Sequence, residues 1–600
     1  MIRFAGDSGD GMQITGNQFT DTSAAVGNDL ATFPDFPAEI RAPAGTRPGV
    51  SGFQIHFSSS DIHTPGDNPD VLVAMNPAAL VTNIGDLKAG GTVVVNTGSF
   101  GANDLKKARC ETNPLEDGSL DGFRVIEVDI NQRAVDAVKD TGLTNKEAQR
   151  CKNFYTLGLM YWLYSRPMEP TLNWLAAKFA KRPELVDANQ KALKAGYNAG
   201  DIRELFQGRY DVPACDDMPP GTYRNIMGNA ALGLGLMAGA DCAGLTAFLG
   251  AYPITPASDI LHQLALFKNH GVVTFQAEDE IAAICAAIGA SFSGMLGITS
   301  TSGPGVALKT EAMGLAVSLE LPLVIVNIQR AGPSTGMPTK VEQTDLNQAL
   351  YGRNGEAPIP IVAAATPADA FDAAVEACRI AVQFMTPVIL LSDNSIANGA
   401  EPWKLPDLEA LPQFKVKFHT DPETFQPYMR DDRLVRPWAI PGTPGLAHRV
   451  GGLEKEDLTG NICYDAANHQ KMTNLRAQKV MNIQDTIPAP EIDGPEKGKA
   501  LVLGWGGTKG SITSACLQLR KEGADVANTH FRNLWPLPPG LDELFGRYES
   551  IVVPELNMGQ LYHLLRSEYP RHNFVSLPKV QGKPFMVSEL VASIKGTLEN

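Results

Sequence analysis

Paired cysteines are absent from this chain of 600 residues. The eight cysteines are scattered, and none belongs to a Cys-x-x-Cys pair: Cys110, Cys151, Cys215, Cys242, Cys285, Cys378, Cys463 and Cys516. Zinc sites, thioredoxin-like motifs and iron–sulfur clusters held by one chain need clustered thiolates. The spacing therefore argues against all three, and most of these cysteines are expected to be small buried side chains.

Positive charge and long apolar runs are also scarce. The sequence has 51 Lys and Arg against 66 Asp and Glu, a net charge of −15, which opposes a nucleic-acid partner because phosphate binding needs a basic face. No window approaches the roughly 20 apolar residues of a membrane span. The N-terminus lacks the apolar stretch of a signal peptide. We therefore expect a cytoplasmic protein with no nucleic-acid or membrane partner.

Short apolar runs alternate with helical patterns along most of the chain, which is typical of doubly wound parallel sheets. Three α/β domains are predicted, with a polar linker and an extended arm rich in Pro, Asp and aromatic residues. The predicted bounds are 1–190 for the first domain, 191–221 for the linker, 222–398 for the second domain, 399–495 for the arm and 496–600 for the last domain. The strands predicted in the second domain are 244–249, 271–275, 297–300, 323–327 and 387–392.

The segment Tyr252-Pro253-Ile254-Thr255-Pro256 follows one of these strands. Its two prolines restrict the backbone on both sides of Thr255. Strand ends are where open α/β sheets bind ligands, so the segment is suited to present the Thr255 hydroxyl. A purely structural turn explains the local chemistry equally well.

Three acids, Glu278, Asp279 and Glu280, open a helix of small residues. Acids at this place suit the helix dipole, which is the simplest explanation. The Ala, Cys and Gly residues that follow predict a helix buried on both faces, with Glu280 nearest the buried part. A buried carboxylate must find a partner or take a proton. Glu280 is therefore a candidate catalytic acid or base.

Two glycine-rich loops follow further strands. Ser300–Gly305 has the composition of a loop that holds an anion or the edge of a cofactor, although plain turns look similar. Arg330 ends a buried strand and leads into a Gly-, Pro-, Ser- and Thr-rich loop that reaches Lys340. An arginine at this edge can hold a carboxylate through two hydrogen bonds, with a surface ion pair as the alternative.

These motifs, in this order, resemble the α subunit of the 2-oxoacid:ferredoxin oxidoreductases, which are thiamine-diphosphate enzymes. The resemblance is carried by Tyr-Pro-Ile-Thr-Pro, by Glu280 before its Ala/Gly-rich helix, by residues 301–305 and by Arg330. It implies that residues 222–398 are a pyrimidine-binding domain. The loop from Arg330 to Lys340 resembles that of the 2-oxoglutarate enzymes.

The resemblance extends to both ends of the chain. Residues 1–190 resemble the γ portion of the family, here fused ahead of α. Residues 553–561, Val-Pro-Glu-Leu-Asn-Met-Gly-Gln-Leu, resemble the transketolase C-terminal-like domain. The family converts a 2-oxoacid, coenzyme A and oxidised ferredoxin to acyl-CoA, carbon dioxide and reduced ferredoxin, or runs the reverse reaction.

The resemblance also implies roles for single residues. Glu280 would hydrogen-bond the aminopyrimidine N1′ of the cofactor, Thr255 the substrate, and Arg330 the substrate carboxylate. Lys340 and Thr339 are the candidates for holding a second carboxylate. The remaining residues implied to bind the cofactor are Tyr252, Pro253, Ile254, Ser302 and Gly303.

A diphosphate site is missing. Thiamine enzymes bind diphosphate and magnesium with a Gly-Asp-Gly motif leading to an Asn, and the only such letters, Gly9-Asp10-Gly11, lie in the γ-like domain, where a structural turn is predicted. We expect a separate β subunit to carry the diphosphate, Mg²⁺ and a [4Fe–4S] cluster, with ferredoxin docking there and an (αβ)₂ assembly. Pyruvate, branched-chain or aryl oxoacids are alternative substrates, and a non-catalytic assembly subunit is an alternative role.

Overall fold

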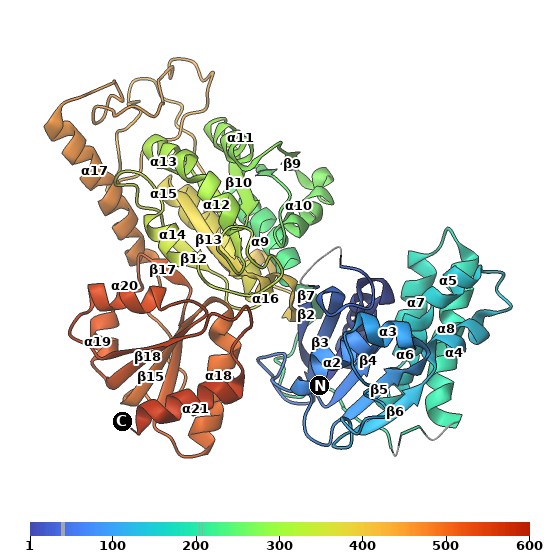
Figure 1. Cartoon of the computed structure of the whole chain (residues 1–600). Coiled ribbons are helices and arrows are strands. Elements are labelled where there is room, and N and C mark those ends of the chain that lie inside the picture. Colours follow the sequence, from blue (N-terminus) through green and yellow to red (C-terminus); the bar gives the residue numbers. More distant parts are fainter. Residues whose placement is uncertain (38–41, 203–204, 207, 600) are drawn as a thin grey trace. The chain divides into compact units, whose positions relative to one another are not determined.

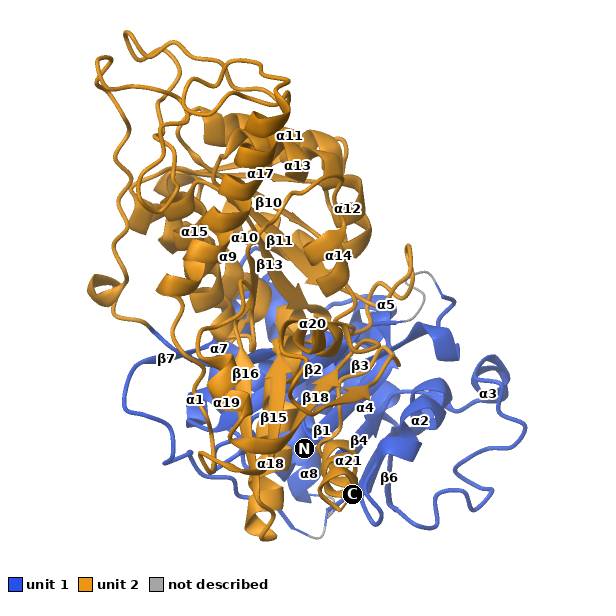
Figure 2. Cartoon of the chain, turned by 90° about the vertical axis from the view of Figure 1, so that its left-hand side faces the viewer, with its two compact units in different colours: residues 1–225, 400–405 blue, residues 226–399, 406–600 orange. Residues whose placement is uncertain are grey.

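The chain divides into two compact units (Figure 2): residues 1–225 with 400–405, and residues 226–399 with 406–600. The computed structural model describes residues 1–37, 42–202, 205–206 and 208–599. Helix α8 (Pro183–Ile202) runs across the predicted domain boundary at residue 190. Residues 400–405, predicted to begin the arm, belong to the first unit.

The first unit contains a six-stranded sheet in the order β2-β3-β1-β4-β5-β6 (Figure 1). Its strands are β1 (Ile2–Asp7), β2 (Asp29–Asp35), β3 (Val50–Ser58), β4 (Val71–Ala74), β5 (Thr92–Asn96) and β6 (Arg124–Val128). Strands β1, β4, β5 and β6 run parallel, and β3 pairs antiparallel with both β1 and β2. The sheet is therefore parallel except for β3, which runs opposite to the other five strands.

Two helices of the first unit pack at unusually close range. Gly158 of α6 (Lys152–Leu163) and Gly196 of α8 allow this approach: a Cβ on Gly158 would lie 2.0 Å from the Leu193 carbonyl oxygen, and one on Gly196 1.9 Å from that of Tyr155. The other helices of this unit are α1 (Met12–Val26), α2 (Pro77–Asn83), α3 (Ala102–Lys107), α4 (Ile130–Val138), α5 (Asn145–Arg150) and α7 (Glu169–Lys178).

The Gly9-Asp10-Gly11 turn, for which a structural role is predicted, is held by contacts of Asp10. The Asp10 carboxylate accepts a hydrogen bond from the Asp7 backbone N–H at 2.8 Å and pairs with Lys152 at 2.6 Å. Both contacts hold the turn between β1 and α1.

The second unit begins with a seven-stranded sheet in the order β17-β12-β13-β11-β10-β8-β9. All its pairs are parallel except β12 with β17, a strand contributed by the C-terminal part of the chain. The strands are β8 (Ala247–Ala251), β9 (Val272–Gln276), β10 (Leu296–Thr301), β11 (Leu323–Gln329), β12 (Ile361–Ala363), β13 (Pro387–Asp393) and β17 (Asn533–Trp535). The helices are α9 (Gly228–Ala243), α10 (Ser258–Ala265), α11 (Glu280–Phe292), α12 (Gly303–Leu308), α13 (Thr310–Leu319), α14 (Leu346–Tyr351), α15 (Asp369–Phe384) and α16 (Asn394–Asn398).

A four-stranded parallel sheet, β16-β15-β18-β19, forms the C-terminal domain. Its elements are β15 (Gly498–Trp505), α18 (Lys509–Lys521), β16 (Val526–Phe531), α19 (Leu541–Phe545), β18 (Tyr548–Glu555), α20 (Gln560–Glu568), β19 (Phe574–Pro578) and α21 (Val587–Leu598). The buried Glu555 carboxylate accepts hydrogen bonds from the backbone N–H groups of Leu561 and Tyr562 at 2.8 and 3.0 Å, which ties β18 to α20. One hydrophobic core joins this domain to the seven-stranded sheet.

The arm that precedes β15 is mostly irregular, but it ends in α17 (Ala466–Met481), which the sequence pattern does not predict. Glu320, 1% exposed, fastens the arm through ion pairs with Arg430 and, at 2.7 Å, with Lys479. Strands β7 (Tyr223–Met227) and β14 (Ala400–Lys404) pair where the chain passes between the units. Within the described residues, none of the helices combines the length and apolar character that a bilayer span requires.

Candidate active site

The predicted site residues gather at one edge of the seven-stranded sheet. Strands β8, β10 and β11 are neighbours and run parallel, so their carboxyl ends lie side by side. Thr255 follows β8, Ser302 follows β10, and Arg330 follows β11 directly. This is the edge at which open α/β sheets bind ligands.

Arg330 and Thr255 are in direct contact. Arg330 Nη1 donates a hydrogen bond of 2.7 Å to the carbonyl oxygen of Thr255, which fixes the stiff turn against the end of β11. Arg330 is only 7% exposed, and its Nε is buried without a partner among the described residues. Burial lowers the pKa of the guanidinium, and the nearby Asp345 counteracts this. A buried cation with an unused donor is suited to bind an anion.

Glu280 is the first residue of α11 and is 8% exposed, whereas Glu278 and Asp279 lie on the surface. Asp279 caps the helix, accepting a hydrogen bond from the Ala282 N–H at 2.8 Å. Gly305 of α12 makes room for the Glu280 side chain: a Cβ there would lie 3.0 Å from Glu280 Cγ and 3.1 Å from Oε1. Within the described residues no hydrogen-bond partner is found for this carboxyl group.

The prediction that α11 is buried on both faces is wrong. Ile281, Cys285 and Gly289, spaced at i, i+4 and i+8, form an exposed stripe. Small apolar residues occur on helix faces buried within a chain and also on exposed faces that a partner protein covers. The composition of α11 therefore does not distinguish these two kinds of face.

Ser302 and Asn327 add unpaired polar atoms to the same edge. Ser302 is fully buried and its Oγ has no partner among the described residues, and the same holds for Asn327 Oδ1. The amide of Asn327 donates to the Asp345 carboxylate at 3.0 Å. Gly303 lies beside the Asp345 carboxylate, and a Cβ on Gly303 would come within 2.7 Å of Asp345 Oδ2.

The loop after Arg330 folds back on itself. The Ala331 N–H donates to the Lys340 carbonyl oxygen at 3.1 Å, so the backbone of Lys340 lies beside the residue that follows Arg330. The Lys340 side-chain stem lies against Gly582, where a Cβ would come within 3.0 Å of Lys340 Cβ. Thr339 is 9% exposed, and its carbonyl oxygen accepts a hydrogen bond from Asn394 at 2.6 Å.

Two family models match the chain. Residues 240–465 match the model described as pyruvate flavodoxin/ferredoxin oxidoreductase, thiamine diphosphate-binding, and residues 1–199 match the pyruvate ferredoxin/flavodoxin oxidoreductase model. The chain is 52% identical, over all of its length and 91% of the relative's, to the 2-oxoglutarate oxidoreductase subunit KorA of Mycobacterium tuberculosis. It is 30% identical to subunit alpha of 2-oxoacid:ferredoxin oxidoreductase 1 of Aeropyrum pernix, over 77% of this chain and 73% of that one.

The chain belongs to the 2-oxoacid:ferredoxin oxidoreductases. A solved structure of the family has the same fold over the whole chain, with a TM-score of 0.87 and 30% identity, covering 100% of this chain and 99% of the other. That structure is the 2-oxoglutarate:ferredoxin oxidoreductase of Magnetococcus marinus with 2-oxoglutarate, coenzyme A and succinyl-CoA bound. The resemblance and the fold class predicted from the motifs are thereby confirmed.

The strand edge fits the pyrimidine half of the family's cofactor. An aminopyrimidine ring has ring nitrogens and an amino group, which need hydrogen-bond partners. The flat ring itself packs against an apolar surface. The unpaired Glu280 carboxyl and Ser302 Oγ offer such partners, and Gly305 keeps the surface flat: a Cβ there would lie 2.0 Å from Thr301 Oγ1. The matched segment 240–465 contains no Gly-Asp-Gly for the diphosphate half.

Sequence reasoning missed Lys309 and Asp345. Lys309, in the turn that links α12 and α13, is 0% exposed, and its Nζ donates to the Glu280 carbonyl oxygen at 2.8 Å and to Thr299 Oγ1 at 3.1 Å. Burial raises the pKa of Asp345 to about 6. The signal for Lys309 was a lone cation after the apolar run 306–308, whereas Asp345 sits in a polar loop that gives no such signal.

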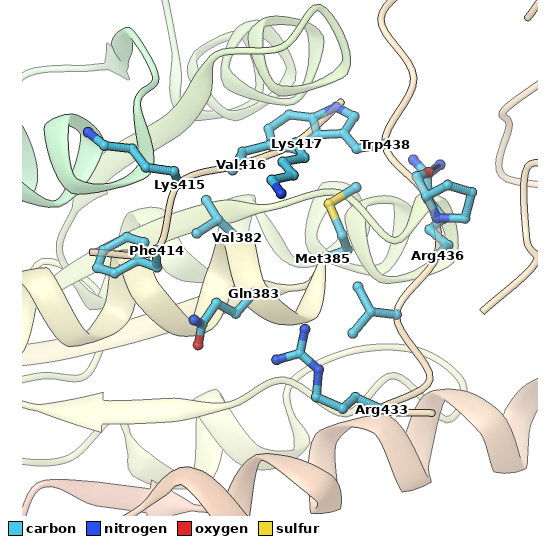
Figure 3. A pocket seen from close by; sticks show the side chains of 12 residues that line it. Val382, Gln383, Met385, Phe414, Lys415, Val416, Lys417, Arg433, Arg436 and Trp438 are labelled. Atoms are coloured by element: carbon cyan, nitrogen blue, oxygen red, sulfur yellow. Dashed lines mark hydrogen bonds between the residues drawn. The ribbon is translucent and has the colours of Figure 1, made fainter. Parts of the chain in front are cut away.

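A cavity of about 250 Å³ lies elsewhere in the second unit, between α15 and the arm (Figure 3). Lys417 and Arg433 extend into it from opposite sides, and Met385 and Trp438 form part of its wall. None of the predicted site residues lines it. The cavity is therefore separate from the strand-edge site.

Proposed function

We propose that this chain is the catalytic α subunit, with the γ portion fused to it, of a 2-oxoglutarate:ferredoxin oxidoreductase. The reaction is the coenzyme A-dependent oxidative decarboxylation of 2-oxoglutarate to succinyl-CoA with reduction of ferredoxin, or its reverse. Two buried groups near the same strand edge carry this proposal: among the described residues, the Arg330 guanidinium keeps an unused donor and the Glu280 carboxyl has no hydrogen-bond partner.

Each group has a specific task in this chemistry. Thiamine diphosphate, when bound, supplies the carbanion and the electron sink for decarboxylation. Glu280 holds a proton at the aminopyrimidine N1′, since a buried carboxyl group can share a proton with a ring nitrogen. Arg330 binds the 2-oxo carboxylate and Thr255 offers its hydroxyl to the substrate. The hydrogen bond from Arg330 to the Thr255 carbonyl oxygen, which joins the two residues, supports these roles.

The remaining predicted residues complete the pocket. Tyr252, Pro253 and Ile254 would bind the cofactor from the turn after β8, and Ser302 and Gly303 would bind it from the segment that follows β10. Lys340 and Thr339 hold the second carboxylate of 2-oxoglutarate, a charge that needs its own cation or hydroxyl. Support for this assignment comes from the fold of the loop, which returns the Lys340 backbone to Ala331.

A β subunit supplies what this chain lacks. It carries the diphosphate contacts, Mg²⁺ and a [4Fe–4S] cluster, and ferredoxin docks on it in an (αβ)₂ assembly in the cytoplasm. Exposed apolar side chains next to the site residues in the sequence support such a partner: Tyr252 at 39%, Phe275 at 41%, Ile281 at 52% and Leu308 at 55% exposed. Large apolar side chains gathered on a surface mark protein interfaces.

The proposal is tested by producing the chain together with its β partner and purifying the complex. Coenzyme A-dependent reduction of ferredoxin or a viologen dye is then measured with 2-oxoglutarate, pyruvate, a branched-chain oxoacid and an aryl oxoacid. We expect 2-oxoglutarate to give the highest kcat/KM. Preference for another oxoacid would reassign the substrate, and no turnover with any of them would favour a non-catalytic assembly subunit.

A further inference from the structure

Lys309 is fully buried and has few partners. Its side chain is 0% exposed, and its Nζ has two neutral acceptors, the Glu280 carbonyl oxygen and Thr299 Oγ1. No ion pair of Lys309 is found in the part of the chain that the structure describes. Burying an ammonium group without a paired carboxylate is costly.

The acidic groups that act on Lys309 all lie on or before the first turns of α11. Glu280 has the largest influence, followed by Asp279 and Cys285, and all three favour the charged ammonium. Asp279 is exposed and occupied as the helix cap, and Cys285 is exposed as well. Of these three groups, only Glu280 is buried.

The segment 303–309 holds Glu280 at two points. Gly305 lies against the Glu280 carboxyl group, and Lys309 binds the Glu280 carbonyl oxygen. The Lys309 N–H in turn donates to the Gly305 carbonyl oxygen at 3.2 Å, so both contacts come from the same helical turn. A shift of this helical turn would therefore move Glu280 and Lys309 together.

We propose that Lys309 is the positioning residue for Glu280: its ammonium group binds the Glu280 carbonyl oxygen, fixes the first turn of α11 and places a positive charge beside the site of the cofactor pyrimidine. This inference rests on the proposed function of Glu280. A neutral donor could also bind the carbonyl group, so the positive charge is the property that a lysine adds at this position. Burial lowers the pKa of Lys309 to about 8, so the charge is present at neutral pH and is lost in mildly alkaline solution.

The test is a titration of bound thiamine diphosphate in the purified complex with the β subunit. Near-ultraviolet circular dichroism distinguishes the protonated from the neutral aminopyrimidine, so the midpoint reports how strongly Glu280 and the ring together hold their proton. In Lys309→Gln, which keeps a donor without the charge, and in Lys309→Met, we expect this midpoint to rise by about one pH unit, because loss of a nearby cation favours proton binding. Lys309→Arg should stay near the wild-type midpoint.

Lys455 is the matched control. It is 3% exposed, its pKa is also lowered to about 8 by burial, and its Nζ donates to Ser318 Oγ at 3.0 Å and to the Gly451 carbonyl oxygen at 2.7 Å. It lies on the arm, so Lys455→Met should lower stability and leave the titration midpoint unchanged. An equal shift in Lys455→Met and Lys309→Met would overturn the proposal.

The outcomes separate this inference from the function on which it rests. If Glu280→Gln leaves turnover and the titration unchanged, the role of Glu280 itself is wrong. If Glu280→Gln abolishes turnover but Lys309→Gln leaves the midpoint in place, only the role of Lys309 is overturned. If neither neutral variant assembles while Lys309→Arg and Lys455→Met do, Lys309 is a structural residue and the proposal fails.

Discussion

Arg330, which follows β11, donates a hydrogen bond of 2.7 Å to the carbonyl oxygen of Thr255, which lies in the turn after β8. One guanidinium thereby holds the backbone of the turn that carries the Thr255 hydroxyl, while its Nε has no partner among the described residues. Arg330 and the turn beside it are thus joined directly.

We expect Arg330→Lys to raise KM for the 2-oxoacid roughly 30-fold or more, with a smaller effect on kcat. A lysine is a point charge and cannot hold the Thr255 carbonyl and a carboxylate together with the geometry of a guanidinium. Steady-state kinetics of the assembled enzyme measure this. Arg353→Lys is the control, because Arg353 donates hydrogen bonds to the backbone carbonyls of Ala349, Leu350 and Ala357. A similar rise in KM in Arg353→Lys would refute the specific role of Arg330.

Glu280→Gln should lower kcat by about 100-fold or more while the subunits still assemble, because an amide cannot exchange a proton with a ring nitrogen. Turnover and gel filtration of the complex provide the two readouts. Asp279→Asn serves as the comparison: it alters the helix cap one residue away and should cost at most about 1 kcal/mol of stability. Normal turnover in Glu280→Gln would exclude a catalytic role for this carboxyl group.

Lys340→Ala is expected to raise KM for 2-oxoglutarate at least about tenfold and to change KM for pyruvate much less. Only 2-oxoglutarate has a second carboxylate, and a charge-assisted hydrogen bond contributes roughly 1.5–3 kcal/mol. The ratio of kcat/KM for the two substrates is the measurement. An equal loss with both would show that Lys340 does not bind the second carboxylate.

The positions of Thr255, Glu280 and Arg330 at one sheet edge could be predicted from the sequence, because each lies at the end of a recognisable element. The strand at 323–327 extends in the structure to Gln329, and the one predicted from 244 begins at Ala247, since Gly244 has a φ of +71° and ends α9. Asp345 could not be recognised, because its significance depends on burial and on neighbours distant in the sequence, whereas Lys309 gave the weak signal of a lone cation after residues 306–308. Helix α17 was missed since only Met472, Lys479 and Val480 of its residues are buried.

Glu320 fastens the arm, and its stability contribution should depend on pH. Burial alone would raise its pKa, but Lys479 and Arg430 lower it from 4.5 to about 2. Because the folded-state pKa lies below the unfolded value, the stabilisation is present above pH 4.5 and is lost as the pH falls toward 2, for a total of about 3 kcal/mol.

Glu320→Gln should therefore destabilise the chain at pH 7 by about 3–5 kcal/mol, since it leaves Lys479 buried without an anion and removes one of the two carboxylates that pair with Arg430. Denaturant unfolding at pH 7 measures this, and limited proteolysis should show earlier cleavage in residues 406–465. Glu454→Gln, which removes a partner of Arg476 and of the exposed His469, should cost less. Comparable losses in the two variants would show that the arm does not depend on Glu320.

The pKa of Asp345 is shifted in the opposite direction to that of Glu320, so its effect on stability should have the opposite sign. Its pKa is raised from 3.8 to about 6 by burial, so the folded state binds the proton more tightly than the unfolded chain, and the ionised carboxylate destabilises the fold above pH 6. Asp345→Asn should therefore stabilise the isolated chain at pH 8 by about 1–3 kcal/mol and have little effect at pH 4. Thermal unfolding at the two pH values decides this. A loss of stability at pH 8 would show that the Asp345 carboxylate, with its bond from Asn327, holds the site together rather than straining it.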